Sequence, residues 1–160
     1  MYYGANKIYK VKLTDNSGKI IVGEVVRIII GKKIYLVKTG NDGFANVKLN
    51  KFKINKYTVT AEYKGFKVSN KITVKSTLTA KNKSIKKGKV LKFTAKLVNT
   101  KGKPVKGKKI TFKIKGKKYS AKTNRKGIAT IKIKNLKVGK YKIQTSYGKV
   151  KISNKITVKK

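Results

Sequence analysis

The chain has 160 residues, and its 45 Lys and Arg against 4 Asp and Glu give a formal net charge of +41. Hydrophobic residues still make up 39% of the chain, which is too many for a disordered polycation, so we expect it to fold. The absence of Cys and His removes disulfides, thiolate metal sites and the commonest general base. Met1–Lys10 lacks the apolar run of a signal peptide, and no stretch approaches the length of a membrane span.

An internal repeat divides the chain. Ser69–Lys75 reads SNKITVK and recurs letter for letter as Ser153–Lys159, an offset of 84 residues. The same offset aligns most of the chain without a gap, and pairs Gly43 with Gly127. This period exceeds the roughly 20 to 50 residues of a solenoid unit, so each copy is expected to bury its own core. We therefore predict two domains, 1–75 and 76–160.

The local pattern is that of strands. Residues such as Lys109–Ile114 alternate polar with apolar side chains, which sends one set to each face of a sheet, and turn residues interrupt the alternation every several positions. Short strands at this spacing predict two tandem all-β sandwich domains. The first copy repeats the strands of the second except the opening one, and the strands expected in the second copy cover 77–80, 90–98, 109–114, 118–122, 128–133, 140–147 and 150–158.

The first copy lacks the counterpart of that opening strand, because residues 76–84 of the second copy would align before Met1. A sandwich without this strand exposes backbone donors and acceptors along the neighbouring edge. We expect the first domain to be the less stable one and to offer an open edge for pairing. The strand would come from upstream sequence in a longer array, or alternatively from a partner or a second copy of the chain.

Two tyrosines occupy equivalent positions before a late strand. Leu136–Tyr141 reads LKVGKY and is matched by Phe52–Tyr57, FKINKY. The pattern looks like the tyrosine corner of immunoglobulin-type sandwiches, in which the phenol ties a loop to the backbone. Tyr57 and Tyr141 are therefore predicted to be structural and not catalytic. The paired positions Leu13/Leu97, Ile28/Phe112, Ala45/Ala129, Val47/Ile131, Val59/Ile143 and Ile72/Ile156 should point into the two cores.

Four segments together carry a resemblance to a known family: GKPVKGKKI at 102–110, KTNRKGIA at 122–129, GKY at 139–141 and NKITVK at 154–159. They resemble bacterial Ig-like repeats and are most similar to those of the adhesin-like surface proteins of methanogenic archaea. The resemblance covers nearly the whole chain. It implies an extracellular structural or adhesive module at the cell surface, with neighbouring Ig-like repeats as partners, and with anionic cell-surface polymers or a host surface as further candidates.

The carboxylates argue against an enzyme. All four, Asp15, Glu24, Asp42 and Glu62, lie in the first copy, whereas the second has 29 basic residues and no acid. The second half therefore cannot assemble a carboxylate dyad, a Ser-His-Asp triad or an ordinary calcium site. We expect no catalytic, cofactor-binding or metal-binding residues; the aspartates are interpreted as turn residues and the glutamates as partners of surface lysines. A carbohydrate-binding or lytic module is the weakest alternative, since the chain has no Trp.

The positive charge suggests an alternative function, a lysine-rich protein that binds polyanions or nucleic acid. Only Arg27 and Arg125 are arginine, so bidentate reading of guanine is nearly excluded, and the lysines follow the strand alternation all round both copies. We interpret most of them as solvated and compositional, with non-specific polyanion binding at low salt. The densest cluster, the candidate polyanion contact, comprises Lys101, Lys103, Lys106, Lys108 and Lys109.

Overall fold

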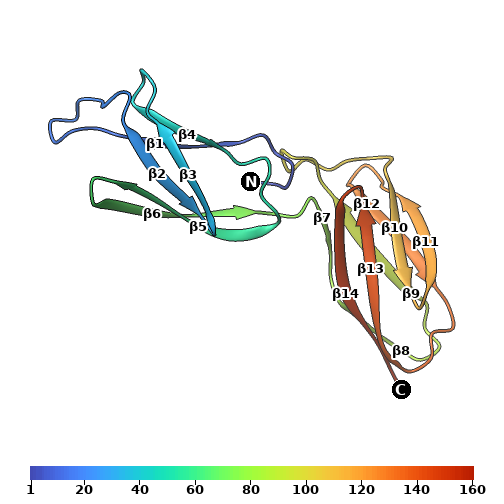
Figure 1. Ribbon diagram of the computed structural model, residues 1–160. Helices are drawn as coiled ribbons and strands as arrows, with labels where there is room; N and C mark the ends of the chain where they lie inside the picture. The colour runs from blue at the N-terminus through green and yellow to red at the C-terminus, as the bar shows by residue number, and fades with distance from the viewer. The chain divides into compact units, whose positions relative to one another are not determined.

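A computed structural model describes residues 1–160 and contains fourteen strands and no helix, which confirms the all-β class. Its contacts divide the chain into two compact units, Met1–Lys75 and Ser76–Lys160, here called unit 1 and unit 2 (Figure 1). Each is described by itself.

Unit 2 is a sandwich of a three-stranded sheet, in the order β12-β9-β7, and a five-stranded sheet, in the order β11-β10-β13-β14-β8. All pairs are antiparallel except β14 with β8. The strands are β7 (Leu78–Ala80), β8 (Lys83–Lys86), β9 (Leu91–Leu97), β10 (Lys109–Ile114), β11 (Lys117–Lys122), β12 (Ile128–Ile133), β13 (Gly139–Tyr147) and β14 (Val150–Lys159).

The alternation in the sequence sets the core of unit 2. Along β9 every second side chain is buried and the residues between are exposed, because neighbouring side chains of a strand point to opposite faces. Phe93 of β9 and Phe112 of β10 meet edge to face between the two sheets, with ring centroids 6.0 Å apart. The lysines of the same strands remain in water.

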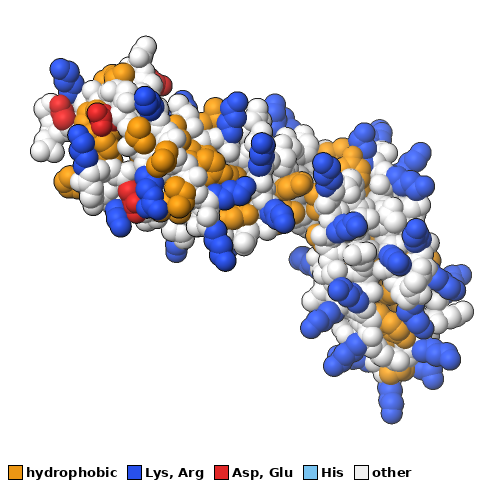
Figure 2. All heavy atoms as spheres, in the orientation of Figure 1, with side chains coloured by type: hydrophobic (Ala, Val, Ile, Leu, Met, Phe, Trp, Pro, Cys, Tyr) orange, Lys and Arg blue, Asp and Glu red, His pale blue; other side chains and the backbone are white.

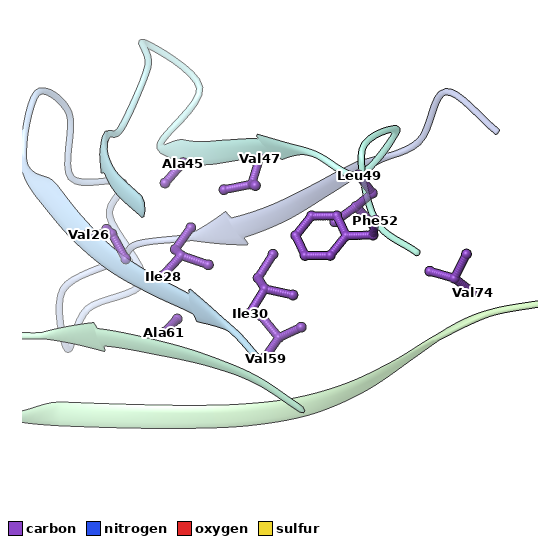
Figure 3. Close-up of a cluster of buried hydrophobic side chains, with 10 residues drawn as sticks. All are labelled: Val26, Ile28, Ile30, Ala45, Val47, Leu49, Phe52, Val59, Ala61 and Val74. Atoms are coloured by element: carbon purple, nitrogen blue, oxygen red, sulfur yellow. The ribbon is translucent and has the colours of Figure 1, made fainter. Parts of the chain in front are cut away.

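Unit 1 repeats this arrangement with fewer strands. One sheet has two strands, β1 (Ile8–Lys12) and β4 (Phe44–Lys48), and the other has four in the order β3-β2-β5-β6. The side chains of the core labelled in Figure 3 lie between the two sheets. The bounds of the larger sheet are β2 (Val25–Ile30), β3 (Lys33–Lys38), β5 (Asn55–Tyr63) and β6 (Phe66–Val74).

The opening region is where the units differ. In unit 2, β7 pairs with β9 and β8 pairs in parallel with β14. Unit 1 has only the last part of the parallel β8–β14 pairing. Tyr2 forms a parallel bridge with Lys75, and the amino group of Met1 donates to the Thr73 carbonyl at 2.8 Å. No strand of unit 1 corresponds to β7.

This difference corrects two expected core positions. Ten of the twelve residues predicted to point into the cores are buried, but Leu13 and Ile72 are only half-buried. Their copies Leu97 and Ile156 are 1% and 0% exposed. The alternation places Leu13 and Ile72 on the inner face as predicted, and without a β7 equivalent that face stays partly open to water.

The β11–β12 turn is tied to the β9–β10 loop through Gly127. Its φ of +72° is a left-handed conformation, and a Cβ built there would lie 2.4 Å from the Leu97 carbonyl oxygen and 3.2 Å from the Pro104 side chain. The Leu97 amide donates to the Gly127 carbonyl at 2.8 Å. Glycine is therefore needed for both conformation and close approach.

We predict that Gly127→Ala destabilises unit 2 far more than Gly116→Ala. Gly116 has a similar φ of +75°, but nothing lies within 4 Å of its added Cβ, so that alanine should cost about 1 to 2 kcal/mol of backbone strain alone. Gly127→Ala should cost about 1 to 3 kcal/mol more, because the Leu97 strand must move. Urea unfolding of the two variants measures the difference, and equal losses would show that the close approach is unimportant.

Candidate functional site

The lysine cluster predicted from the sequence lies on the loop that joins β9 to β10 and includes Lys109, the first residue of β10. All five side chains, Lys101, Lys103, Lys106, Lys108 and Lys109, are exposed, and we call this surface the lysine loop. Two side chains hold its backbone. The Asn99 Oδ1 accepts from the amides of Lys101 and Lys103 at 2.9 and 3.0 Å, and the buried Thr123 Oγ1 accepts from the Lys108 amide at 2.9 Å.

Further positive charge lies beside the lysine loop. The Gly107 amide donates to the Thr123 carbonyl and the Thr123 amide to the Lys108 carbonyl, which brings the turn carrying Arg125 and Lys126 next to the loop. No carboxylate in unit 2 offsets these charges. On the face seen in Figure 2, however, blue side chains are spread over both units and do not gather in one groove. The geometry therefore suits contact with a polyanion better than recognition of a particular sequence.

Both predicted corner tyrosines bond to backbone. The Tyr141 hydroxyl donates to the Lys137 carbonyl at 2.7 Å, and the Tyr57 hydroxyl donates to the Lys53 carbonyl at 3.0 Å. Their rings are half-buried. The Tyr57 ring also packs edge to face on Phe52, with centroids 5.2 Å apart. Each phenol thus fixes the loop before β5 or β13.

The four carboxylates of unit 1 lie apart from one another, each with its own partners. Asp15 accepts from Ser17 and from the Lys19 amide within one turn, and these hydrogen bonds lower its carboxyl pKa. Asp42 Oδ1 accepts from the Phe44 amide at 3.1 Å. Glu24 accepts from the Tyr63 hydroxyl at 3.1 Å. No group of His, Cys, Asp or Glu is arranged to hold a metal ion, and no helix in the structure could cross a membrane.

Glu62 is held mainly by Arg27, although the sequence interpretation gave it a lysine partner. Arg27, Glu62 and Lys67 follow one another across β2, β5 and β6 on the outer face of the sheet. Glu62 bonds to Arg27 and lies 3.3 Å from the Lys67 Nζ. The hydrogen bond from Arg27, followed by that from Lys67, lowers the pKa of the Glu62 carboxyl. The pairing register of three strands brings these three charged side chains together. The periodicity of a single strand cannot predict such a contact.

An open groove runs along β1 in unit 1. It has a volume of about 580 Å³ and lies between β1 and the β5–β6 hairpin. Phe66 and Val68, at its border, are 80% and 64% exposed. We call it the β1 groove; its lining includes Tyr9, Val11, Leu13, Phe66, Val68 and Asn70. The sequence predicts the open edge but not the groove, which depends on how the hairpin lies across from β1.

Similarity to known proteins shows the family of the chain. The profile of the bacterial Ig-like domain (group 1) family matches residues 73–159, which include all of unit 2 except its last residue. The chain belongs to this family. Together with the two-sheet architecture, the match confirms the predicted Ig-like β-sandwich class. No curated protein matches the chain.

Solved structures of low sequence identity are also similar. The D0-D1 domain of intimin is 19% identical with a TM-score of 0.42, over 97% of this chain and 90% of that one. Invasin, described as a bacterial integrin-binding protein, is 19% identical with a TM-score of 0.42, over 94% of this chain and 35% of that one. Domains 4 and 5 of the S-layer protein SbsC are 15% identical with a TM-score of 0.36, over 94% and 80%.

We predict that acid destabilises unit 1 selectively. The pKa values of Asp15 and Glu62 are lowered in the folded chain below their ordinary values of 3.8 and 4.5, so their stabilising effect is complete above about pH 4.5 and is lost as the pH falls through the folded values. Asp15 is exposed and Glu62 is half-buried at the surface of its sheet, so solvent screens both groups and the effect is modest. Unit 2 has no Asp or Glu and should lack this transition.

Amide hydrogen exchange of the full chain at pH 7 and pH 3, corrected for intrinsic rates, measures the free energy of opening of each unit separately. Opening of unit 1 should become more frequent at pH 3 while that of unit 2 hardly changes. Glu62→Gln should reduce the pH dependence of unit 1. An equal response in both units would contradict the assignment.

Proposed function

We propose that the chain is a non-catalytic structural and adhesive module of a cell-surface protein, of the adhesin-like kind known from methanogenic archaea. The observation that carries this proposal is the match to the bacterial Ig-like domain family in a chain that repeats the same strand pattern. Members of this family are mostly structural or adhesive modules and typically lie at the cell surface. Its partners would be neighbouring Ig-like repeats, with anionic polymers of the surface as further contacts.

The construction of each unit supports a structural role. Both units bury their own apolar core between two sheets, and both tie the loop before a late strand through a tyrosine. Such units can be linked in series, because each one is stable through its own contacts. Function in a module of this kind lies on its surface, in edges, faces and loops.

Digestion of intact cells with trypsin tests the surface location. In cells that make the parent protein, trypsin should release peptides from the exposed lysine-rich segments, such as the lysine loop, before any cytoplasmic marker protein is cut. Mass spectrometry identifies the peptides. If these peptides appear only after lysis, together with the cytoplasmic marker, the chain is not displayed at the surface and the proposal is wrong.

The lysine loop supports a second candidate function, charge-driven contact with anionic polymers. The five exposed lysines of the lysine loop, beside Arg125 and Lys126, lie in a unit that has no Asp or Glu. Lysine ammonium groups are point charges that attract phosphate or sulfate without reading a sequence. Duplex DNA, RNA and heparin should therefore bind with similar affinity, which falls as salt rises.

We predict that replacing the five lysines of the lysine loop by Gln weakens heparin and duplex DNA binding more than a matched variant with five other exposed lysines replaced, namely Lys89, Lys118, Lys132, Lys140 and Lys151. For DNA the slope of log K against log salt should become shallower by about 0.9 for each phosphate that is no longer neutralised. Equal weakening in both variants would show that the overall field binds the polymer and that the loop has no special part. Strong preference for one DNA sequence at physiological salt would contradict charge-driven contact.

A further inference from the structure

The place of β7 in unit 2 defines what the β1 groove of unit 1 can accept. In unit 2, Leu78, Thr79 and Ala80 of β7 lie opposite Leu97, Lys96 and Ala95 of β9 in an antiparallel ladder. The Val98 amide donates to the Thr77 carbonyl at 2.9 Å, which extends the pairing by one residue. β7 also contacts β13 and β14 of the opposite sheet, and Leu78 is fully buried. This short strand therefore closes the space between β9 and the β13–β14 hairpin.

Unit 1 has every neighbour of that strand but not the strand itself. At offset 84, β1 corresponds to β9, and the β5–β6 hairpin corresponds to β13–β14. Phe66 is 80% exposed, whereas its copy Val150 is 6% exposed. Tyr9 and Val11 of β1 are half-buried, whereas their copies Phe93 and Ala95 are each 1% exposed. The inner face of unit 1 is thus apolar and incompletely covered along the β1 groove.

A polar side chain in the groove supports the same conclusion. In unit 2, Asn154 Nδ2 donates to the carbonyl of Ala80, the last residue of β7, at 3.0 Å. Its copy in unit 1 is Asn70, whose Nδ2 instead donates to the Tyr9 hydroxyl at 3.2 Å. Unit 1 has therefore kept the amide that in unit 2 holds the end of β7. A carbonyl at the corresponding place could accept the same hydrogen bond.

We propose that unit 1 is a strand acceptor: its β1 groove binds a short, uncharged, extended segment from outside residues 1–160, antiparallel to β1. By the register of unit 2, a leucine-sized side chain would lie opposite Leu13, a polar residue opposite Lys12 and a small residue opposite Val11. Val11 is larger than its copy Ala95, so the residue opposite it should be no larger than alanine. The exposed lysine at position 12 does not prevent pairing, since Lys96 stands at the same place opposite Thr79.

A second copy of this chain does not fit this description. Two copies would bring together chains that each carry +41, which opposes association. Within residues 1–160, the segment with the required chemistry is β7, and Leu78 is already buried in unit 2. The occupant is therefore a strand from outside residues 1–160, which would add to the sheet as a donor strand does to an incomplete sheet.

Titration of the isotopically labelled full chain with a capped peptide tests the proposal. The probe is Ser-Thr-Leu-Thr-Ala-Ser-Asn, which repeats residues 76–82 with Lys81 replaced by Ser to remove its charge. Saturable changes of amide resonances should be confined to β1 and the β5–β6 hairpin. Exchange of the Lys12 and Thr14 amides, the copies of Lys96 and Val98 in unit 2, should slow on binding, which distinguishes strand pairing from mere apolar contact.

Variants assign the binding to the groove. Phe66→Ser should weaken the binding of the peptide at least about threefold, because less apolar surface is buried. Asn70→Ala should weaken it about fivefold, because one hydrogen bond is removed. Leu36→Ser is the matched control: Leu36 of β3 is 71% exposed but lies outside the groove, so its replacement should leave binding unchanged. A peptide with Asp in place of Leu should not bind.

Several outcomes would overturn the proposal. These are the absence of saturable changes in unit 1, equal changes throughout unit 2, or binding that is insensitive to Phe66→Ser and Asn70→Ala. Concentration-dependent association of the chain without peptide, with the same β1 amides protected, would show instead that a second copy occupies the groove. Phe66 and Asn70 are exposed residues at the β1 groove and are not part of the buried core of unit 1, so their variants are expected to fold.

Discussion

The covering of each sheet's inner face by the opposite sheet is the constraint on which both units depend. Strand alternation sends one apolar row inward, and that row is stable only if a second layer excludes water from it. In unit 2 this holds along the whole of β9, whose inner residues Leu91, Phe93, Ala95 and Leu97 are all nearly inaccessible. In unit 1 the residues of the same row, Tyr9, Val11 and Leu13, are only half-buried and line the β1 groove. This loss of cover follows from the single strand that unit 2 has and unit 1 lacks.

The same alternation explains how a chain of charge +41 can fold. A lysine placed between two core residues of a strand points to the outer face, where the charge stays hydrated and is screened by salt within about 10 Å at ordinary ionic strength. Lys92 and Lys96 of β9 are exposed while their neighbours in sequence are buried. Positive charge therefore costs little core stability but creates a field around the protein. The outer face is not uniform, however: unit 1 exposes Ile34 and Leu36 where unit 2 has Lys118 and Ser120.

The sequence predicts those parts of the fold that depend on local pattern. Each strand expected in unit 2 is present with small shifts at its ends, because alternation and turn residues are properties of a few neighbouring positions. β8 was not predicted: in Lys83–Lys86 only Ile85 is apolar, and the strand exists through parallel pairing with β14, about 73 residues away. Lys67 is a lysine partner of Glu62 as predicted, but its second partner Arg27 and the amide position of Asn70 were missed for the same reason. They depend on which strands become neighbours, and a single strand does not contain that information.

The internal repeat supplies what single-strand patterns lack, because each copy is a reference for the other. Asn154 alone would be interpreted as a surface residue that happens to contact a loop, and Asn70 alone as the partner of a tyrosine. Aligned, they occupy one position on one strand: the amide meets the Ala80 carbonyl where β7 is present and the Tyr9 hydroxyl where no such strand lies. The half-burial of Leu13 has the same origin, since its copy Leu97 lies directly opposite Leu78. The half-buried apolar residues of β1 are thus those that face the place of one strand.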